Sequence, residues 1–307
     1  MDRPIQLSRR AVVRGGVLSI AGAILPALGQ AVSLRGTALK IGALTDVHYA
    51  DKPALGTRYY RDSLAKVRAA CAQFRQAGVQ VLVELGDLID AAQDAEQEIG
   101  WLRAIDAELA RACDDRHYVL GNHCLATLTR EEFTANTGPR RQSGYYSFDC
   151  ASVRCLILDA CYTTAGLPYA RGNFDFRDTA LPAEELAWLA AELKAADRPC
   201  VLFTHQRLDG PDDEVHTVKN ASAIRRILEG SGKVLAVFQG HSHRNDYREI
   251  AGIPYCVLRA VVEGQGVASS GHAIITVTPE GGLEVQGFVE QSTHKIAPQR
   301  LSAQTQK

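Results

Sequence analysis

Polar side chains follow five apolar segments of the sequence, at the point where each segment ends. They are carboxylates, one amide and imidazoles: Asp46, His48, Asp87, Asp90, Asn122, His123, His205, His241 and His243. Taken alone, each has an ordinary explanation, because an Asp after a strand often caps a helix and a single His is usually a surface residue. Together they match the mixed oxygen and nitrogen ligands that Mn²⁺, Fe²⁺ and Zn²⁺ accept in proteins. The set predicts a metal site, provided that the five segments meet.

A pair of divalent ions would account for this mixture of ligand types. Two ions roughly 3.5–4 Å apart need one ligand that bridges them and several that serve only one ion. A carboxylate suits the bridge because it has two anionic oxygens, and an Asn adds a neutral carbonyl oxygen. The eight cysteines include no Cys-x-x-Cys pair, which argues against a structural zinc ribbon.

The elements that must position these residues alternate in the manner of an α/β protein. Strands are predicted over 39–46, 79–87, 117–123, 199–206 and 233–243. Helices are predicted over 61–78, 95–112, 181–196 and 220–232. Shorter strand pairs are predicted over 144–160, 253–264 and 272–288. Because the carboxyl ends of strands in an open α/β sheet meet at one crevice, one domain with two sheets and outer helices would gather the polar residues.

Composition excludes some classes of protein. The chain has 307 residues, of which 46% are hydrophobic, so it can bury a substantial core. Its formal net charge is −1, and it has no block of Lys and Arg of the kind that follows a phosphate backbone. We therefore expect no stable nucleic-acid partner.

The first thirty-one residues differ from the rest. A basic stretch with Ser8, Arg9 and Arg10 precedes an apolar stretch that is too short to span a bilayer comfortably. The alternative is a buried N-terminal helix, but the basic stretch resembles the twin-arginine export motif. The resemblance implies a signal peptide over 1–31, the twin-arginine export machinery as partner, and a periplasmic or extracellular protein without a membrane span in its mature form. The domain is then expected over 39–290, followed by a polar tail over 291–307.

Five blocks in order carry a second resemblance: Asp-x-His, Gly-Asp-x-x-Asp, Gly-Asn-His, a lone His and Gly-His-x-His. They resemble the calcineurin-like metallophosphoesterase family over nearly the whole chain after the N-terminal segment. The resemblance implies a four-layer α/β/β/α sandwich with two mixed β-sheets, of the metallo-dependent phosphatase type. It also implies two divalent ions (Mn, Fe or Zn) and a division of the ligands between them. Asp46, His48 and His243 hold one ion, Asn122, His205 and His241 hold the other, and Asp87 bridges the two.

The same resemblance implies hydrolysis of a phosphodiester, diphosphate or phosphomonoester of a small molecule, by attack of a metal-bridging hydroxide. His123 faces the scissile phosphate as the catalytic residue. Most relatives carry an acidic residue after Gly-Asn-His, where this chain has Cys124, so His123 must be oriented by the backbone or by another side chain. The alternatives are a non-catalytic metal- or phosphate-binding protein that retains the fold, and a nuclease.

Three polar loops supply candidate contacts to a small phosphorylated substrate. Basic residues can grip phosphate and a Tyr can stack on a base or sugar, although such amphipathic residues often only begin a helix. The candidates are Arg58, Tyr60, Arg61, Asn173, His216 and Asn220. The overall pattern is similar to the branch that includes manganese-dependent ADP-ribose/CDP-alcohol diphosphatases and cyclic nucleotide phosphodiesterases.

Overall fold

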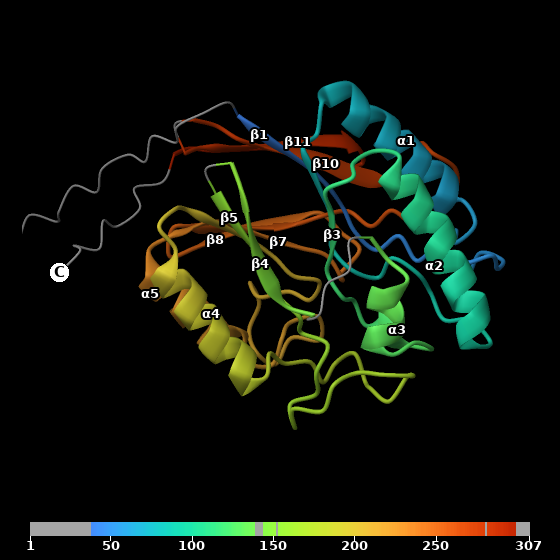
Figure 1. Ribbon diagram of the computed structural model, residues 1–307, viewed down its shortest axis with the longest axis horizontal. Coiled ribbons are helices and arrows are strands. Elements are labelled where there is room, and N and C mark those ends of the chain that lie inside the picture. Colours follow the sequence, from blue (N-terminus) through green and yellow to red (C-terminus); the bar gives the residue numbers. More distant parts are fainter. Residues whose placement is uncertain (1–37, 139–143, 152, 280, 299–307) are drawn as a thin grey trace, which may run out of the picture.

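Two six-stranded sheets lie face to face, and helices cover their outer faces (Figure 1). The structure is a computed structural model that describes residues 38–138, 144–151, 153–279 and 281–298. The predicted four-layer α/β/β/α sandwich is confirmed. The predicted signal peptide lies outside the described residues. Within the described segments, no helix has both the length and the apolar character needed to cross a membrane.

The first sheet has the order β12-β11-β10-β1-β2-β3 and mixes parallel with antiparallel pairs. Its strands are β1 Leu39–Leu44, β2 Val81–Glu84, β3 Arg116–Tyr118, β10 Gly271–Val277, β11 Leu283–Val289 and β12 His294–Ile296. The second sheet has the order β4-β5-β6-β7-β9-β8. Its strands are β4 Tyr146–Cys150, β5 Val153–Ile157, β6 Cys200–Phe203, β7 Val234–Gln239, β8 Asp246–Ile250 and β9 Ile253–Val257.

Strand residues alternate between two cores because successive side chains point to opposite faces of a sheet. In β6, Val201 and Phe203 pack between the two sheets, whereas Leu202 packs in the cluster that includes residues of the second pair of helices. In β2, Val83 faces the space between the sheets and Leu82 packs in the cluster with the first pair of helices. Both sheets are therefore buried on both faces over their central strands.

Two pairs of helices form the outer layers (Figure 1). The helices of the described segments are α1 Ser63–Ala77, α2 Ala95–Ala110, α3 Arg130–Ala135, α4 Ala183–Ala195 and α5 Ala221–Ser231, with a short 3-10 turn η1 at His123–Leu125. Helix α1 contacts α2 and α4 contacts α5. Gly78, the last residue of the helix predicted over 61–78, adopts a left-handed conformation with φ of 67°, and its N–H caps the end of α1.

Three of these elements were not expected from the sequence. Helix α3 and strand β8 fall in segments with no clear apolar period, and β12 lies within the predicted polar tail. Strand β12 pairs with β11 through Leu283 and Ile296, so the sheet extends beyond residue 290.

The crevice is formed by strand ends from both sheets and not by one sheet alone. Strands β1, β2 and β3 run parallel in the first sheet, and β6 and β7 run parallel in the second. The two sets meet directly, since the backbone N–H of His241 after β7 donates to Asp46 Oδ2 after β1 at 3.0 Å. The ends of five strands thus converge on one place.

Candidate active site

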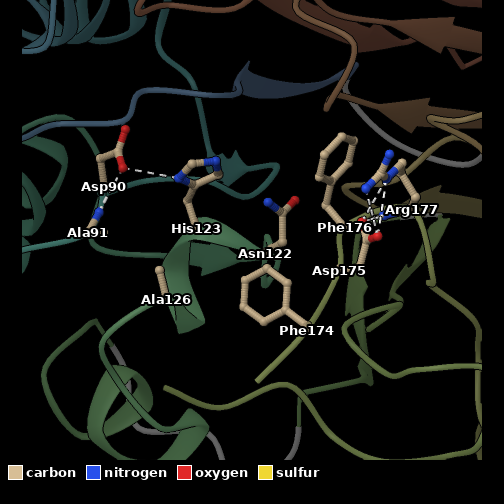
Figure 2. A pocket seen from close by; sticks show the side chains of 9 residues that line it. All are labelled: Asp90, Ala91, Asn122, His123, Ala126, Phe174, Asp175, Phe176 and Arg177. Carbon is tan, nitrogen blue, oxygen red and sulfur yellow. Dashed lines mark hydrogen bonds and ion pairs between the residues drawn. The ribbon is translucent and has the colours of Figure 1, made fainter. Parts of the chain in front are cut away.

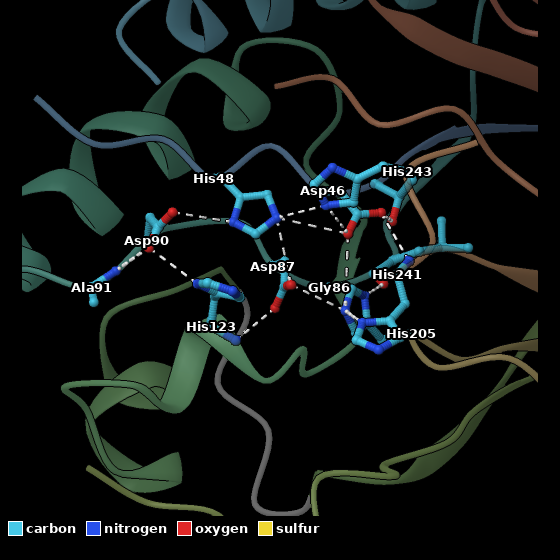
Figure 3. Close-up of polar contacts among 12 residues, drawn as sticks. Asp46, His48, Gly86, Asp87, Asp90, Ala91, His123, His205, His241 and His243 are labelled. Carbon is cyan, nitrogen blue, oxygen red and sulfur yellow. Dashed lines mark hydrogen bonds and ion pairs between the residues drawn. The ribbon is translucent and has the colours of Figure 1, made fainter. Parts of the chain in front are cut away.

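Six of the seven predicted metal ligands, all but Asn122, lie together at this convergence (Figure 3). Each comes directly after a strand, so that a sheet fixes the position of its backbone. Asp46 and His48 follow β1, Asp87 follows β2, Asn122 follows β3, His205 follows β6, and His241 and His243 follow β7. Side chains far apart in the sequence are thereby held within a few ångströms.

The first group contains Asp46, His48 and His243. His243 Nε2 lies 3.3 Å from Asp46 Oδ1, and His48 Nε2 lies 3.8 Å from the same oxygen. The two ring nitrogens His48 Nε2 and His243 Nε2 are 3.2 Å apart. One cation between these three atoms would contact all of them.

The second group contains Asp87, His205 and His241. His205 Nε2 lies 3.2 Å from Asp87 Oδ2 and 3.1 Å from His241 Nδ1. Asp87 Oδ2 is also 3.5 Å from His48 Nε2 of the first group, so this carboxylate lies between the two groups, as a bridging ligand must. Asn122 precedes His123, whose backbone N–H donates to Asp87 Oδ1 at 2.7 Å.

The tautomers of the histidines favour cations at both positions. His205 Nδ1 donates to the backbone carbonyl of Leu85 at 2.9 Å, and His243 Nδ1 donates to Glu263 Oε1 at 2.7 Å. In its neutral form each ring then has a lone pair on Nε2, directed at another histidine nitrogen about 3 Å away. Such lone pairs repel one another unless a proton or a metal ion lies between them.

Buried atoms without partners support the same conclusion. Asp46 Oδ1, Asn122 Oδ1 and His241 Nε2 are buried and have no hydrogen-bond partner. Leaving such atoms unsatisfied costs free energy, which a bound cation would recover. Carboxylate, amide and imidazole donors also suit Mn²⁺, Fe²⁺ or Zn²⁺. The residues therefore fit two divalent ions.

The carboxylates and imidazoles of the two groups shift one another's pKa values. Burial alone would raise the pKa of Asp46, but His243 and His205 hold it well below its usual range. Burial alone would lower the pKa of His205 and His243. Asp87 and Asp46 raise the pKa of His205 to about 9, and Asp46 and Glu263 raise that of His243 to about 9. Metal-free protein consequently keeps protons where metal ions would lie.

The ligands hold an unusual backbone conformation. Nine non-glycine residues of the described segments have positive φ, and five of them are predicted ligands: Asp46, His48, Asp87, His241 and His243. Positive φ is costly for residues with a side chain, and residues in such conformations gather at functional sites. The left-handed turns direct these side chains into the crevice.

Two glycines beside the ligands are required by close approach. A Cβ atom on Gly240 would collide with the side chains of Thr45 and Asp46, and one on Gly121 would collide with Asp87. The φ of Gly240 is not positive, so its role is not to form a left-handed turn but to let the loop after β7 pass beside β1.

Asp90 orients the predicted catalytic residue. His123 Nδ1 donates to Asp90 Oδ1 at 3.0 Å, which directs the opposite ring nitrogen away from Asp90. The neighbouring Cys124 is fully buried, and burial raises its pKa well above the ordinary value, so its thiol is not a nucleophile. Asp90 thus supplies the orienting side chain that sequence alone did not assign.

A cavity of about 370 Å³ opens beside His123 and Asn122 (Figure 2). Its opposite wall includes Phe174 and Phe176, and Phe176 is 37% exposed. The ring of Phe176 also lies 5.8 Å from that of His241. An organic group attached to a phosphate at the site would meet aromatic side chains here.

Two of the six predicted substrate contacts lie at the site. Arg58 pairs through its backbone with Glu263, and its charge opposes protonation of both His123 and His243. The ring of His216 lies 5.2 Å from that of His241.

The other four candidates lie in different surroundings. The ring of Tyr60 is buried at 3% exposure beneath the ammonium of Lys52, so it offers no face to a substrate. Arg61 pairs with Asp51 at the surface. Asn173 bonds within its own loop, to the backbone of Ala170 and Pro168, and Asn220 bonds to the backbone of Leu181. Their amides stabilise loops.

Sequence reasoning missed Glu263, Phe176 and Lys52. Glu263 follows β9 and contacts His243, but no spacing relates a single Glu to a His twenty residues earlier. Lys52 lies 3.2 Å from Asp90 Oδ1 and comes from the loop after β1. The one available signal was the second Asp of Gly-Asp-x-x-Asp, which marks Asp90 as a companion of the site.

Comparison with known proteins places these observations in a wider group. No family model matches the chain. Over 282 residues, 72% of this chain and 87% of the other protein, it is 26% identical to the manganese-dependent ADP-ribose/CDP-alcohol diphosphatase of Danio rerio. The protein of the same name from Arabidopsis thaliana is 29% identical over 142 residues, 43% of this chain and 46% of that protein.

Solved structures with the same fold include two phosphatases. A dimetal phosphatase from Danio rerio superposes with a TM-score of 0.73 at 21% identity, covering 85% of this chain and 99% of that one. A purple acid phosphatase from yellow lupin seeds superposes with a TM-score of 0.57 at 13% identity, covering 85% of this chain and 53% of that one. This fold, and the ligand blocks gathered at its strand ends, are those that the resemblance to the calcineurin-like metallophosphoesterase superfamily implies.

Proposed function

We propose that the chain is a metal-dependent phosphohydrolase that cleaves the diphosphate bond of a small nucleoside diphosphate derivative. The observation that carries the proposal is the pair of ligand groups joined by Asp87, with His123 and an aromatic-walled cavity beside them. The similarity to a manganese-dependent ADP-ribose/CDP-alcohol diphosphatase supports the same class of substrate.

Two divalent ions are the cofactors of this activity. Asp46, His48 and His243 would hold one, Asn122, His205 and His241 the other, and Asp87 would contact both. When bound, the ions polarise a phosphoryl oxygen and lower the pKa of water. Hydrogen bonds from the opposite ring nitrogens hold the ligand nitrogens in the direction of the ions: His205 donates to Leu85 O, and His243 donates to Glu263.

His123 is positioned to protonate the leaving oxygen. It lines the cavity, and its Nδ1 is committed to Asp90, so the other ring nitrogen is available. Burial lowers the pKa of His123, but the negative charges of Asp87 and Asp90 outweigh burial and raise it. A raised pKa favours the protonated form of the ring, which is the form that a general acid requires.

The residues around the cavity favour a diphosphate that carries an aromatic group. Phe176 presents a partly exposed ring on which a base can stack, and Phe174 is fixed by stacking on Tyr169, with ring centroids 4.3 Å apart. Arg58 lies close enough to His123 for its positive charge to lower the pKa of that ring, and such a charge near the site suits a second phosphate.

A substrate screen on metal-defined protein tests the proposal. Purified protein would be stripped with chelator, reloaded with Mn²⁺, Fe²⁺ or Zn²⁺, and assayed with ADP-ribose, a CDP-alcohol, bis-p-nitrophenyl phosphate, p-nitrophenyl phosphate, a cyclic nucleotide and single-stranded DNA. We expect metal-dependent release of a nucleoside monophosphate from the diphosphates. His123→Ala should lose turnover while retaining two ions per chain.

Other outcomes would favour the alternatives. Two bound ions without hydrolysis of any substrate would indicate a non-catalytic binding protein. Hydrolysis confined to DNA, with salt-sensitive binding, would indicate a nuclease. Loss of an ion from His123→Ala would show that the division of roles in the site is wrong.

We also propose export by the twin-arginine route, on the basis of Arg9 and Arg10 and the apolar stretch that follows them. The test is localisation of the full chain and of an Arg9→Lys/Arg10→Lys variant in a bacterial host. Wild-type protein should appear outside the cytoplasm and the variant inside it. Equal distribution of the two proteins would exclude this route.

A further inference from the structure

Lys66 is a buried cation that the proposed chemistry does not use. It lies on the first turn of α1, and its side chain is almost wholly inaccessible, at 1% exposure. None of the ion pairs found within the described segments includes Lys66. A buried ammonium without a carboxylate partner is costly, so its retention calls for a compensating set of contacts.

Four consecutive backbone carbonyls surround the ammonium. Lys66 Nζ lies 3.0 Å from Val261 O, 3.4 Å from Val262 O, 3.0 Å from Glu263 O and 2.6 Å from Gly264 O. An ammonium has three protons and no acceptor, so it can donate to several carbonyls at once. Residues 261–264, the Lys66-bound segment, are thereby drawn into one compact turn.

The Lys66-bound segment joins the parts of the first metal group through its backbone. Val262 N–H donates to the carbonyl of Asp46 at 3.0 Å, and Val261 N–H donates to the carbonyl of Thr45 at 3.0 Å. The segment also pairs with the loop that carries Arg58, since Tyr59 N–H donates to Val262 O at 2.9 Å.

A side chain of the same segment completes the connection. Glu263 Oε1 accepts from His243 Nδ1 at 2.7 Å, and this contact determines which nitrogen of His243 faces Asp46. Glu263 is itself only partly buried and is attached to the fold through its backbone, where Lys66 binds. A displacement of the segment would therefore move the partner of a metal ligand.

The ammonium carries its charge under working conditions. Burial lowers the pKa of Lys66 to about 8, with Asp62 and Glu263 opposing this effect. At neutral pH the side chain is thus protonated, and all of its donors are available to the carbonyls.

We propose that Lys66 is a positioning residue for the first metal group, which holds Glu263, and through it His243, in the orientation that binds an ion. The inference rests on the proposed dimetal function. Lys66 is expected to affect one ion and not the other. Among the described residues, the Lys66-bound segment contacts His243 and Asp46 and makes no hydrogen bond to His205 or His241.

Direct Mn²⁺ binding to chelator-stripped protein tests the proposal without any reliance on activity. We expect wild-type protein to bind two Mn²⁺ ions, and Lys66→Met to weaken one of them by about tenfold or more, as loss of an outer-shell partner does. The other ion should bind as in wild type.

Lys233→Met is the matched control. Lys233 Nζ also donates to backbone carbonyls, those of Lys194 at 2.9 Å and Ala196 at 2.6 Å, but it lies at the opposite ends of the strands from the site. Its loss should lower the melting temperature and leave both Mn²⁺ affinities unchanged. Equal weakening in the two variants would reduce Lys66 to a general stabilising residue and overturn the proposal.

A second comparison distinguishes the route through Glu263. In a Glu263→Ala background, Lys66→Met should weaken Mn²⁺ binding by less than threefold further, since the contact it supports is already lost. If the losses of Mn²⁺ affinity caused by Lys66→Met and Glu263→Ala were fully additive, Lys66 would not act through Glu263.

If Lys66→Met fails to fold, Lys66→Gln, which retains two donors, takes its place in both comparisons, with a smaller expected loss of Mn²⁺ affinity. Wild-type affinities in that variant would overturn the proposal, and absence of Mn²⁺ binding to wild-type protein would overturn the proposed function instead.

Discussion

Replacement of Asp90 by asparagine removes one charge beside His123 and leaves the shape of the site unchanged. Asp90 Oδ1 accepts from His123 Nδ1 at 3.0 Å and from the backbone N–H of Ala91 at 2.7 Å, and an asparagine oxygen can keep the second contact. The carboxylate is only 5% exposed, so water screens its interaction with His123 weakly. Asp90→Asn therefore isolates the electrostatic support of the imidazolium.

The size of the effect follows from this geometry. A hydrogen bond to a charged group contributes about 1.5–3 kcal/mol. If Asp90→Asn removes about 2 kcal/mol of transition-state stabilisation, kcat should fall roughly 30-fold. KM should change little, because Asp90 lies behind His123. The two Mn²⁺ ions should remain, since His48 Nδ1 is 3.5 Å from Asp90 Oδ2 and keeps its other contacts.

The assay compares two diesters with different leaving groups. When the leaving group is 4-nitrophenolate, it needs little protonation, so Asp90→Asn should cost less than it does with an alkoxide leaving group. Equal losses for the two substrates would refute the assignment of His123 as general acid. Loss of a metal ion from the variant would show instead that Asp90 supports His48.

Four further outcomes are expected. Phe176→Ala should raise KM for a nucleoside diphosphate about tenfold, because base–aromatic stacking contributes about 1–3 kcal/mol, and should leave KM unchanged for a diphosphate that lacks a base. His205 and His243 have a pKa of about 9 in metal-free protein, so Mn²⁺ binding at pH 7 should release about two protons, which calorimetry in buffers of different ionisation enthalpy would detect. For the same reason the apparent affinity for Mn²⁺ should rise with pH up to about 9. Burial lowers the pKa of His272 to about 4, so between about pH 6.5 and pH 4 the unfolded chain binds a proton at this residue and the folded chain does not. The free energy of unfolding therefore falls by up to about 3 kcal/mol as the pH is lowered through that range. Urea unfolding of His272→Gln should show a smaller fall over the same range. Removal of both metal ions by chelator should lower the melting temperature by about 10 °C, since each ion at 100 times its Kd stabilises by about 2.7 kcal/mol.

The convergence of the candidate metal ligands could be predicted because each occupies a position defined by secondary structure. Asp46 and His205 come directly after buried apolar strands, and such strands are apparent from composition alone. Their convergence followed from the parallel pairing of the strands. That the crevice joins two sheets, with β1 facing β7 across Asp46 and His241, is a property of tertiary packing that no local pattern encodes.

Other parts of the site depend on contacts that are distant in the sequence. Tyr60 was expected to face the substrate because Tyr is amphipathic, but Ala50, Ala260 and Val262 enclose its ring in a small apolar cluster. Asn220 resembled a site residue because it lies in a polar loop, yet its amide pairs with Leu181 from the loop before α4. Strand β8 escaped notice because an edge strand exposes half its residues and shows no apolar run.

The backbone at the site explains why the fold and the metal site depend on each other. Asp46 and Asp87 adopt left-handed conformations, which Asp tolerates moderately well, but His48, His241 and His243 adopt them too, and each costs about 1 kcal/mol or more. Together with the buried Asn122 Oδ1 and His241 Nε2, which have no hydrogen-bond partner, these turns make the metal-free crevice costly to form. The layers on either side supply the stability that holds these turns in place, and the ions recover part of the cost when they bind. A site assembled in this way binds metal tightly because its ligands are already fixed in direction before the ions arrive.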